Sequence, residues 1–237
     1  MEIPVYLAMT AAEFGTCKQL PQHCAWLSCL FSPYGTGLSN IPKQLPPDSL
    51  VILSDRTPIR NHDPELVYQI LLQTLPALSS KGLLLDFEQP VTPASLEIVQ
   101  KLVTLPYPVG VSAGHAKDFD CPVFLPYLPP SDTLEAHLAP WQGREIWLEI
   151  STTTKEITVT PSGATFQTTL GEQNLPYKDE DLHTHYGIWI DDKQARFTLQ
   201  RRIEDNQELL EAGRAMGVTL GVGLHQEFLN DVNAANG

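Results

Sequence analysis

The chain is a series of short, almost continuous apolar runs separated by polar stretches that contain most of its glycine and proline. Runs that are apolar at consecutive positions are typical of strands buried on both faces, and such strands belong to parallel sheets. We predict eight of them, at Pro4–Met9, Ala25–Phe31, Leu50–Asp55, Gly82–Glu88, Pro108–Gly114, Pro122–Tyr127, Glu145–Ser151 and Val218–Leu224. Eight parallel strands close a (β/α)8 barrel, so the expected fold class is α/β, a TIM barrel.

Helices are predicted in only some of the connections between these strands. Asp63-Pro64 and Thr92-Pro93 each place a capping side chain before a proline at the first helical position. A third helix is predicted from about Asp192 to Met216. Only six residues, His115 to Asp120, separate the fifth and sixth strands. The barrel is therefore expected to be trimmed, with several helices reduced to turns.

The longest connection, between the seventh and eighth strands, has a β pattern. KEITVTPSGATFQTTL indicates a hairpin that turns at Pro161-Ser162-Gly163, and THYGIWIDD indicates a further strand. We expect one TIM-barrel domain over residues 1–237, with a small β-hairpin insertion at about 155–190.

Composition narrows the classes of partner. At 237 residues and 42% hydrophobic content the chain can bury one sizeable core. Its formal charge of −13 argues against nucleic acid or an anionic membrane as a partner, and favours a neutral ligand. The N-terminus lacks the pattern of a secretory signal, so a cytoplasmic location is expected. The four cysteines form no CxxC pair and are expected to be reduced thiols; neither a metal nor a cofactor is expected.

Two carboxylates end the fourth predicted strand, in GLLLDFEQP from Gly82 to Pro90. Side chains alternate along a strand, so Asp86 and Glu88 share the face of Leu84, which points into a barrel. Neighbouring carboxylates directed inward cost free energy unless they have a use or a partner. They are either a catalytic pair, at the strand ends where barrel enzymes place their sites, or part of a structural ion pair. The candidate partners for an ion pair are Lys81, Arg56 and Arg144.

GLLLDFEQP resembles the DxxDxDxE signature of family 18 glycoside hydrolases, the chitinase family. The segments ITVTPSGATF, HYGIWIDDKQARF and VTLGVGL are similar to the closing part of its leaderless, spore-associated members. The resemblance implies retaining, substrate-assisted hydrolysis of a glycan that contains N-acetylglucosamine, such as peptidoglycan fragments or chitin-like oligomers. Glu88 would protonate the glycosidic oxygen, and Asp86 would hold the substrate's acetamido group. Tyr127, after the sixth strand, would hydrogen-bond the same group.

The sequence departs from the family pattern at several positions. Lys81 and Leu84 stand at the two earlier acidic positions, and Leu128 stands where an aspartate is expected after the tyrosine. The SxGG element is Ser54-Asp55-Arg56-Thr57, and the tryptophan at the end of the last strand falls near His225. Two alternatives therefore stay open: a family 18-like carbohydrate-binding protein without turnover, and an unrelated metal-dependent barrel enzyme.

Other residues at strand ends are candidates for substrate binding. Glu149 ends the seventh strand and could bind sugar, act as a second acid or pair with an arginine. Asp55 could bind ligand or cap the turn that follows it. Tyr34 lies in the loop after the second strand, and His225 follows the last strand. The expected partner is a carbohydrate; the oligomeric state is left open.

Overall fold

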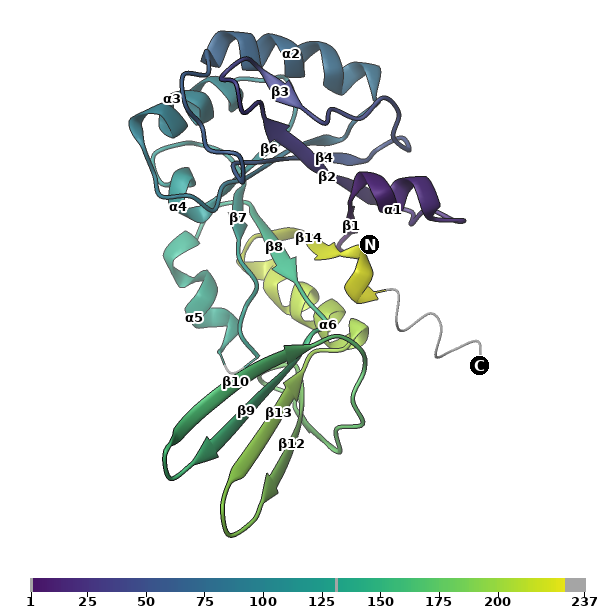
Figure 1. The fold of residues 1–237 in the computed structure, drawn as a ribbon, viewed down its shortest axis with the longest axis vertical. Coiled ribbons are helices and arrows are strands. Elements are labelled where there is room, and N and C mark those ends of the chain that lie inside the picture. Colours follow the sequence, from purple (N-terminus) through teal and green to yellow (C-terminus); the bar gives the residue numbers. More distant parts are fainter. Residues whose placement is uncertain (1, 131, 229–237) are drawn as a thin grey trace.

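The computed structural model describes residues 2–130 and 132–228. Eight parallel strands form a closed barrel, in the order β1, β14, β8, β7, β6, β5, β4, β2, with β1 also paired to β2 (Figure 1). Their bounds are β1 Val5–Met9, β2 Cys24–Phe31, β4 Leu50–Ser54, β5 Gly82–Asp86, β6 Val109–Ser112, β7 Val123–Leu125, β8 Ile146–Ile150 and β14 Val218–Leu224. The eight predicted strands and the TIM-barrel fold class are confirmed.

The helices around the barrel are uneven in length. α2 (Pro64–Ala77) and α3 (Pro93–Leu102) begin where predicted, because Asp63 and Thr92 each accept a backbone N–H of the first turn. The remaining connections before β8 carry only α1 (Ala11–Thr16), β3 (Leu38–Ser39), α4 (Ala113–Ala116), α5 (Leu134–Leu138) and the 3₁₀ turn η1 (Ala139–Trp141). The barrel is trimmed, as expected. In the part of the chain that the structure describes, no helix has both the length and the apolar character needed to cross a bilayer.

The prediction of a helix from Asp192 was wrong over its first half. Residues 195–200 form a strand, β13, and the helix α6 covers only Ile203–Gly213, followed by the 3₁₀ turn η2 (Arg214–Met216). The reason is local: the Asp191 carboxylate accepts the backbone N–H groups of Lys193 and Gln194, and the Asp191 N–H donates to the Gln194 carbonyl. These bonds close a hairpin turn in a stretch that we had interpreted as helical.

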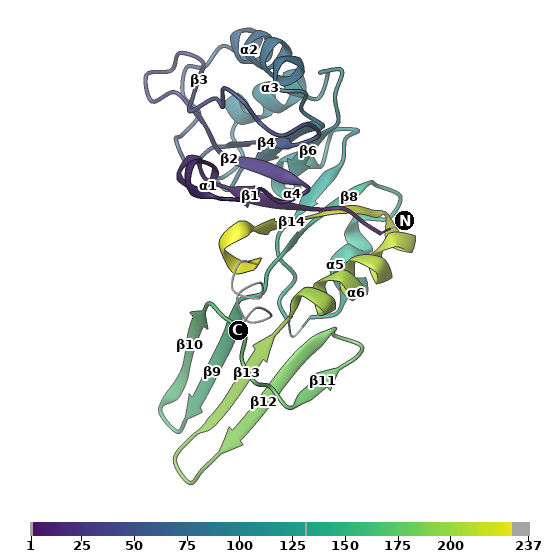
Figure 2. The same cartoon turned by 90° about the vertical axis from the view of Figure 1, so that its right-hand side faces the viewer.

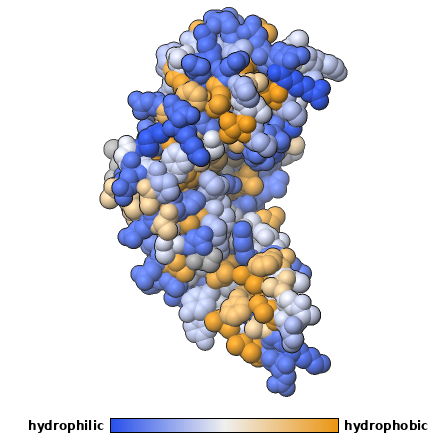
Figure 3. Space-filling model, turned by 90° about the vertical axis from the view of Figure 1, so that its left-hand side faces the viewer, coloured by the Kyte–Doolittle hydropathy of each residue, from blue (hydrophilic) through white to orange (hydrophobic). Residues whose placement is uncertain are grey.

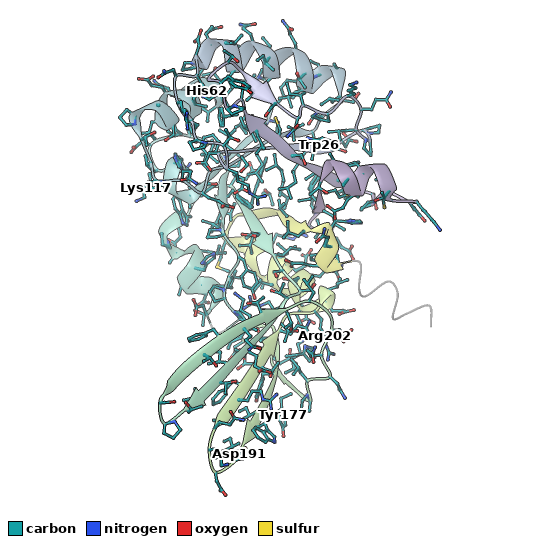
Figure 4. The ribbon with its side chains drawn as sticks, in the orientation of Figure 1. Trp26, His62, Lys117, Tyr177, Asp191 and Arg202 are labelled. Atoms are coloured by element: carbon teal, nitrogen blue, oxygen red, sulfur yellow. The ribbon has the colours of Figure 1, made fainter. Side chains whose placement is uncertain are left out.

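The connection between β8 and α6 is a separate antiparallel sheet, here called the insertion sheet. Its strand order is β10 (Gly163–Thr169), β9 (Thr154–Thr160), β13 (Ala195–Gln200), β12 (Thr184–Ile190) and β11 (Tyr177–Asp179). It extends ten residues further than predicted, to Gln200. Figures 1 and 2 show it projecting away from the barrel, with Arg202 at the junction and Asp191 at the far tip (Figure 4).

The interior of the barrel is filled below its C-terminal mouth. Inward side chains of the strands form one apolar cluster, which includes Leu50, Ile52, Leu84, Phe124 and Trp147. A Cβ added at Gly110 would overlap the Trp147 ring, so the indole occupies space that only glycine leaves free. A ligand site inside the barrel therefore lies above this layer, at the strand ends.

Candidate functional site

The inward positions change from apolar to acidic at the mouth of the barrel. Asp86 follows Leu84 on the inner face of β5, and Glu149 follows Trp147 on the inner face of β8. A pocket of about 400 Å³ lies between them, lined by Asp86, Phe87, Glu88, Ser112, Ala113, Gly114, Phe124, Pro126 and Glu149. A narrower adjoining space of about 110 Å³ shares Asp86, Glu88, Phe124 and Glu149 and adds Arg56 and Leu224, among others. We call the two together the barrel-mouth pocket.

Asp86 is the deeper of the two carboxylates in the DFE sequence. Burial, together with the nearby carboxylates of Glu88 and Glu149, raises the pKa of Asp86 to about 6, while Arg56 acts in the opposite direction. Asp86 can therefore exchange a proton close to neutral pH, which is a property of groups in catalytic sites.

Glu149 faces Asp86 across the pocket. Its carboxylate accepts the backbone N–H of Tyr127 at 3.0 Å. Burial raises the pKa of Glu149, that hydrogen bond opposes the effect, and the charges of Glu227 and Glu88 add to it. Glu227 was not among the sequence candidates; its carboxylate accepts the backbone N–H of Thr152 at 3.1 Å.

Glu88 lies on the rim, with 59% of its side chain exposed. Its Oε1 is 4.0 Å from Nη2 of Arg56, and so exposed a pair contributes little to stability. Of the three cations proposed as partners, Arg56 is the one that reaches the carboxylates. Arg144 instead donates to backbone carbonyls, including those of Phe119 and Cys121.

The loop that carries Glu88 is held by two buried or half-buried polar side chains. Both carboxylate oxygens of Asp55 accept backbone N–H groups, of Glu88 at 2.8 Å and Gln89 at 3.0 Å. Ser112 accepts the N–H of Phe87 at 2.9 Å and donates to the Leu85 carbonyl. Asp55 is only 2% exposed and is not among the residues that line the barrel-mouth pocket, so its hydrogen bonds position the Glu88 loop, whereas the sequence left ligand binding and a cap of its own turn open.

Three further candidates are not among the residues that line the pocket. The Tyr127 hydroxyl is buried without a hydrogen-bond partner among the described residues, and burial raises the pKa of this tyrosine to about 12. His225 is buried, and its Nδ1 lies 3.3 Å from Oε1 of Glu13. Tyr34 is 87% exposed on its loop and does not line the pocket. Pro126, which precedes Tyr127, and Leu224, which precedes His225, line the pocket instead.

The metal alternative finds no support in the described residues, where no three side chains of His, Cys, Asp or Glu are grouped as metal ligands. One His-x-His spacing, His183 and His185, escaped the sequence analysis. Their Nδ1 atoms lie 3.3 Å from Glu208 and 2.7 Å from Asp205, so each imidazole is paired with one carboxylate of α6. The pairs join the insertion sheet to the barrel.

The sequence matches no protein-family model, and no curated protein is similar to it in sequence. Solved structures do resemble the fold. A chitinase from Chromobacterium violaceum matches with a TM-score of 0.61 at 11% identity, over 99% of this chain and 98% of that one. The spore cortex-lytic enzyme SleL of Bacillus cereus matches with a TM-score of 0.58 at 10% identity, over 96% and 72%. A family 18 N-acetylglucosaminidase from Paenibacillus barengoltzii matches with a TM-score of 0.57 at 9% identity, over 93% and 94%. At these identities the likeness establishes the fold alone, a TIM barrel similar to the barrels of these enzymes.

Proposed function

We propose that this protein hydrolyses a glycan containing N-acetylglucosamine at the barrel-mouth pocket, by a retaining and substrate-assisted mechanism. One observation carries the proposal: Asp86, Glu88 and Glu149 line a single pocket at the C-terminal ends of the barrel strands. The fold supports it, because similar structures include a chitinase and an N-acetylglucosaminidase.

In this proposal each carboxylate has a different part. Glu88, exposed on the rim, donates its proton to the glycosidic oxygen as the bond to the anomeric carbon breaks. Asp86, one inward position deeper, accepts the acetamido N–H, and the acetamido oxygen forms the new bond to the anomeric carbon. Water then attacks that carbon as its bond to the acetamido oxygen breaks, Glu88 takes the water's proton, and the product keeps its configuration. Glu149, opposite Asp86, accepts hydrogen bonds from sugar hydroxyl groups.

A second function, glycan binding without turnover, is favoured by two features of the same site. Arg56 holds the exposed Glu88 carboxylate in an ion pair. The Tyr127 hydroxyl, which the family resemblance assigned to the acetamido group, is buried outside the pocket. Fewer side chains are therefore placed to hydrogen-bond the acetamido group than the resemblance implied.

Exchange of Glu88 for glutamine separates the two functions, since it removes the transferable proton and keeps the shape. With fluorogenic N-acetylglucosamine oligomers as substrates, Glu88→Gln is expected to lower kcat by ~10²–10⁴-fold and to leave oligomer affinity nearly unchanged. Glu97→Gln, the same exchange at an exposed position of α3, is the matched control and should retain wild-type kcat. A wild-type protein that binds oligomers and cleaves none would establish the binding function instead.

A further inference from the structure

One face of the insertion sheet is apolar and exposed. Alternate residues of each strand point to the same side, and on this side the two rows nearest the hairpin turns are apolar, whereas the next row toward the barrel includes Lys155. The first row is Ile188, Phe197, Ile157 and Phe166, and the second is Ile190, Ala195, Val159 and Ala164. We call these eight residues the distal apolar face. Phe166 is 74% exposed and Ile190 is 69% exposed. Figure 3 shows apolar side chains gathered on this part of the molecule.

The opposite face of the same strands is mostly polar. Thr158, Thr165, Arg196 and Trp189 share a row there. Arg196 makes an ion pair with Glu156 and lies over the ring of Trp189. Leu175 packs on that side, 3.3 Å from where a Cβ of Gly187 would lie. The sheet therefore follows the pattern of one layer of a β-sandwich, polar outside and apolar inside, with the second layer absent from the described chain.

The charge distribution selects the kind of partner. The chain carries a net charge of −13, which opposes contact between copies over most surfaces. The distal apolar face has no charged residue, and neither does β10, the edge strand beside it (GATFQTT). Native edge strands usually carry charge or proline against pairing with other chains. The two rows also lack polar side chains for the hydroxyl groups of a sugar, which argues against a glycan on this face.

The area of the distal apolar face is compatible with a reversible homodimer. A face of this size buries on the order of 500 Å² per copy, so two copies would bury about 1,000 Å², the lower limit for a specific interface. Since the sheet projects away from the barrel (Figures 1 and 2), two such faces can meet while the barrels stay apart. We propose that the distal apolar face is a homodimer interface, in which the insertion sheets of two copies pack face to face.

Sedimentation velocity over roughly a hundredfold range of concentration tests the proposal, because dimerisation depends on concentration. Wild type is expected to convert from monomer to dimer as concentration rises. The double variant Phe166→Asp with Ile190→Asp is expected to weaken the dimer by ~100-fold or more, since each carboxylate would be buried without a partner. The matched control, Thr165→Asp with Gln167→Asp, adds the same charge to β10 on the polar face and should dimerise like wild type.

Several results would overturn the proposal. A wild-type monomer at every concentration is one, and equal loss of the dimer in both double variants is another, since that would indicate pairing through the β10 edge. Binding to phosphatidylcholine vesicles that requires Phe166, by a protein that stays monomeric, would assign the face to lipid. If circular dichroism shows that the aspartates unfold the hairpin, Phe166→Ser with Ile190→Ser removes the same apolar side chains without charge. That variant must also weaken the dimer.

Discussion

Replacing Asp86 with asparagine is expected to stabilise the folded protein at neutral pH, although it removes a proposed catalytic group. The folded environment raises the pKa of Asp86 from 3.8 to about 6, mainly through burial. Between these two values the folded chain holds a proton that the unfolded chain has released. The free energy of unfolding therefore falls as pH rises from about 4 to about 6.

The pKa displacement sets the size of the effect. About two pH units at 1.36 kcal/mol each give about 3 kcal/mol as an upper limit, and partial solvation of the carboxyl reduces this to about 1–3 kcal/mol. Asparagine is neutral at every pH and does not incur this cost. Asp86→Asn should therefore match wild type near pH 4 and exceed it by about 1–3 kcal/mol above pH 6, while its turnover falls.

Urea unfolding followed by tryptophan fluorescence measures this difference at a series of pH values. Other titrating groups are common to both proteins, so they cancel when the variant is compared with wild type at each pH. Asp118→Asn, at an exposed position after α4, controls for the loss of one negative charge. A difference between Asp86→Asn and wild type that stays constant from pH 4 to pH 7 would refute the reasoning.

The remaining predictions concern the residues around the pocket. Asp55→Asn removes one of the two oxygens that accept backbone N–H groups of the Glu88 loop. It should lower the free energy of unfolding by about 1.5–3 kcal/mol in urea titrations, and it should also lower kcat. An unchanged free energy of unfolding would show that Asp55 does not position the loop. Tyr127→Phe and Glu149→Gln form a contrasting pair in oligosaccharide titrations: the first should leave affinity unchanged because its hydroxyl is buried outside the pocket, and the second should weaken binding because Glu149 lines it. The reverse outcome would show that the ligand lies elsewhere.

The strands of the barrel were predictable because each is a short apolar run between turn residues, and burial on both faces leaves that pattern in the sequence. The alternation of side chains along a strand placed Asp86 and Glu88 on the inner face. Applied to the end of every other strand, the same alternation predicts which residues point into the barrel. On β4 the inner positions run through Ile52 and Ser54, so Asp55, the next residue, falls on the outer face. Candidates chosen for chemistry alone at a strand end, without this alternation, were the ones that the structure places elsewhere.

Two features were beyond the sequence for different reasons. Of the three candidate cations, Arg56 is the one that reaches Glu88 because the loop after β4 folds toward the loop after β5, and such a tertiary contact between distant segments leaves no local pattern. The first half of the predicted third helix became β13 because its partners, β9 and β12, supply backbone hydrogen bonds that local propensity does not include.

The packing of Trp147 over Gly110 also determines how a polymer can use this barrel. Because the Trp147 indole closes the barrel axis, the pocket at the mouth has one opening, and no polymer can pass through the barrel. Under the proposed function, a long glycan would lie across the rim or insert one end, and each product would leave by the path along which the substrate entered. Release of product and entry of the next substrate would then compete for the same opening, above Asp86.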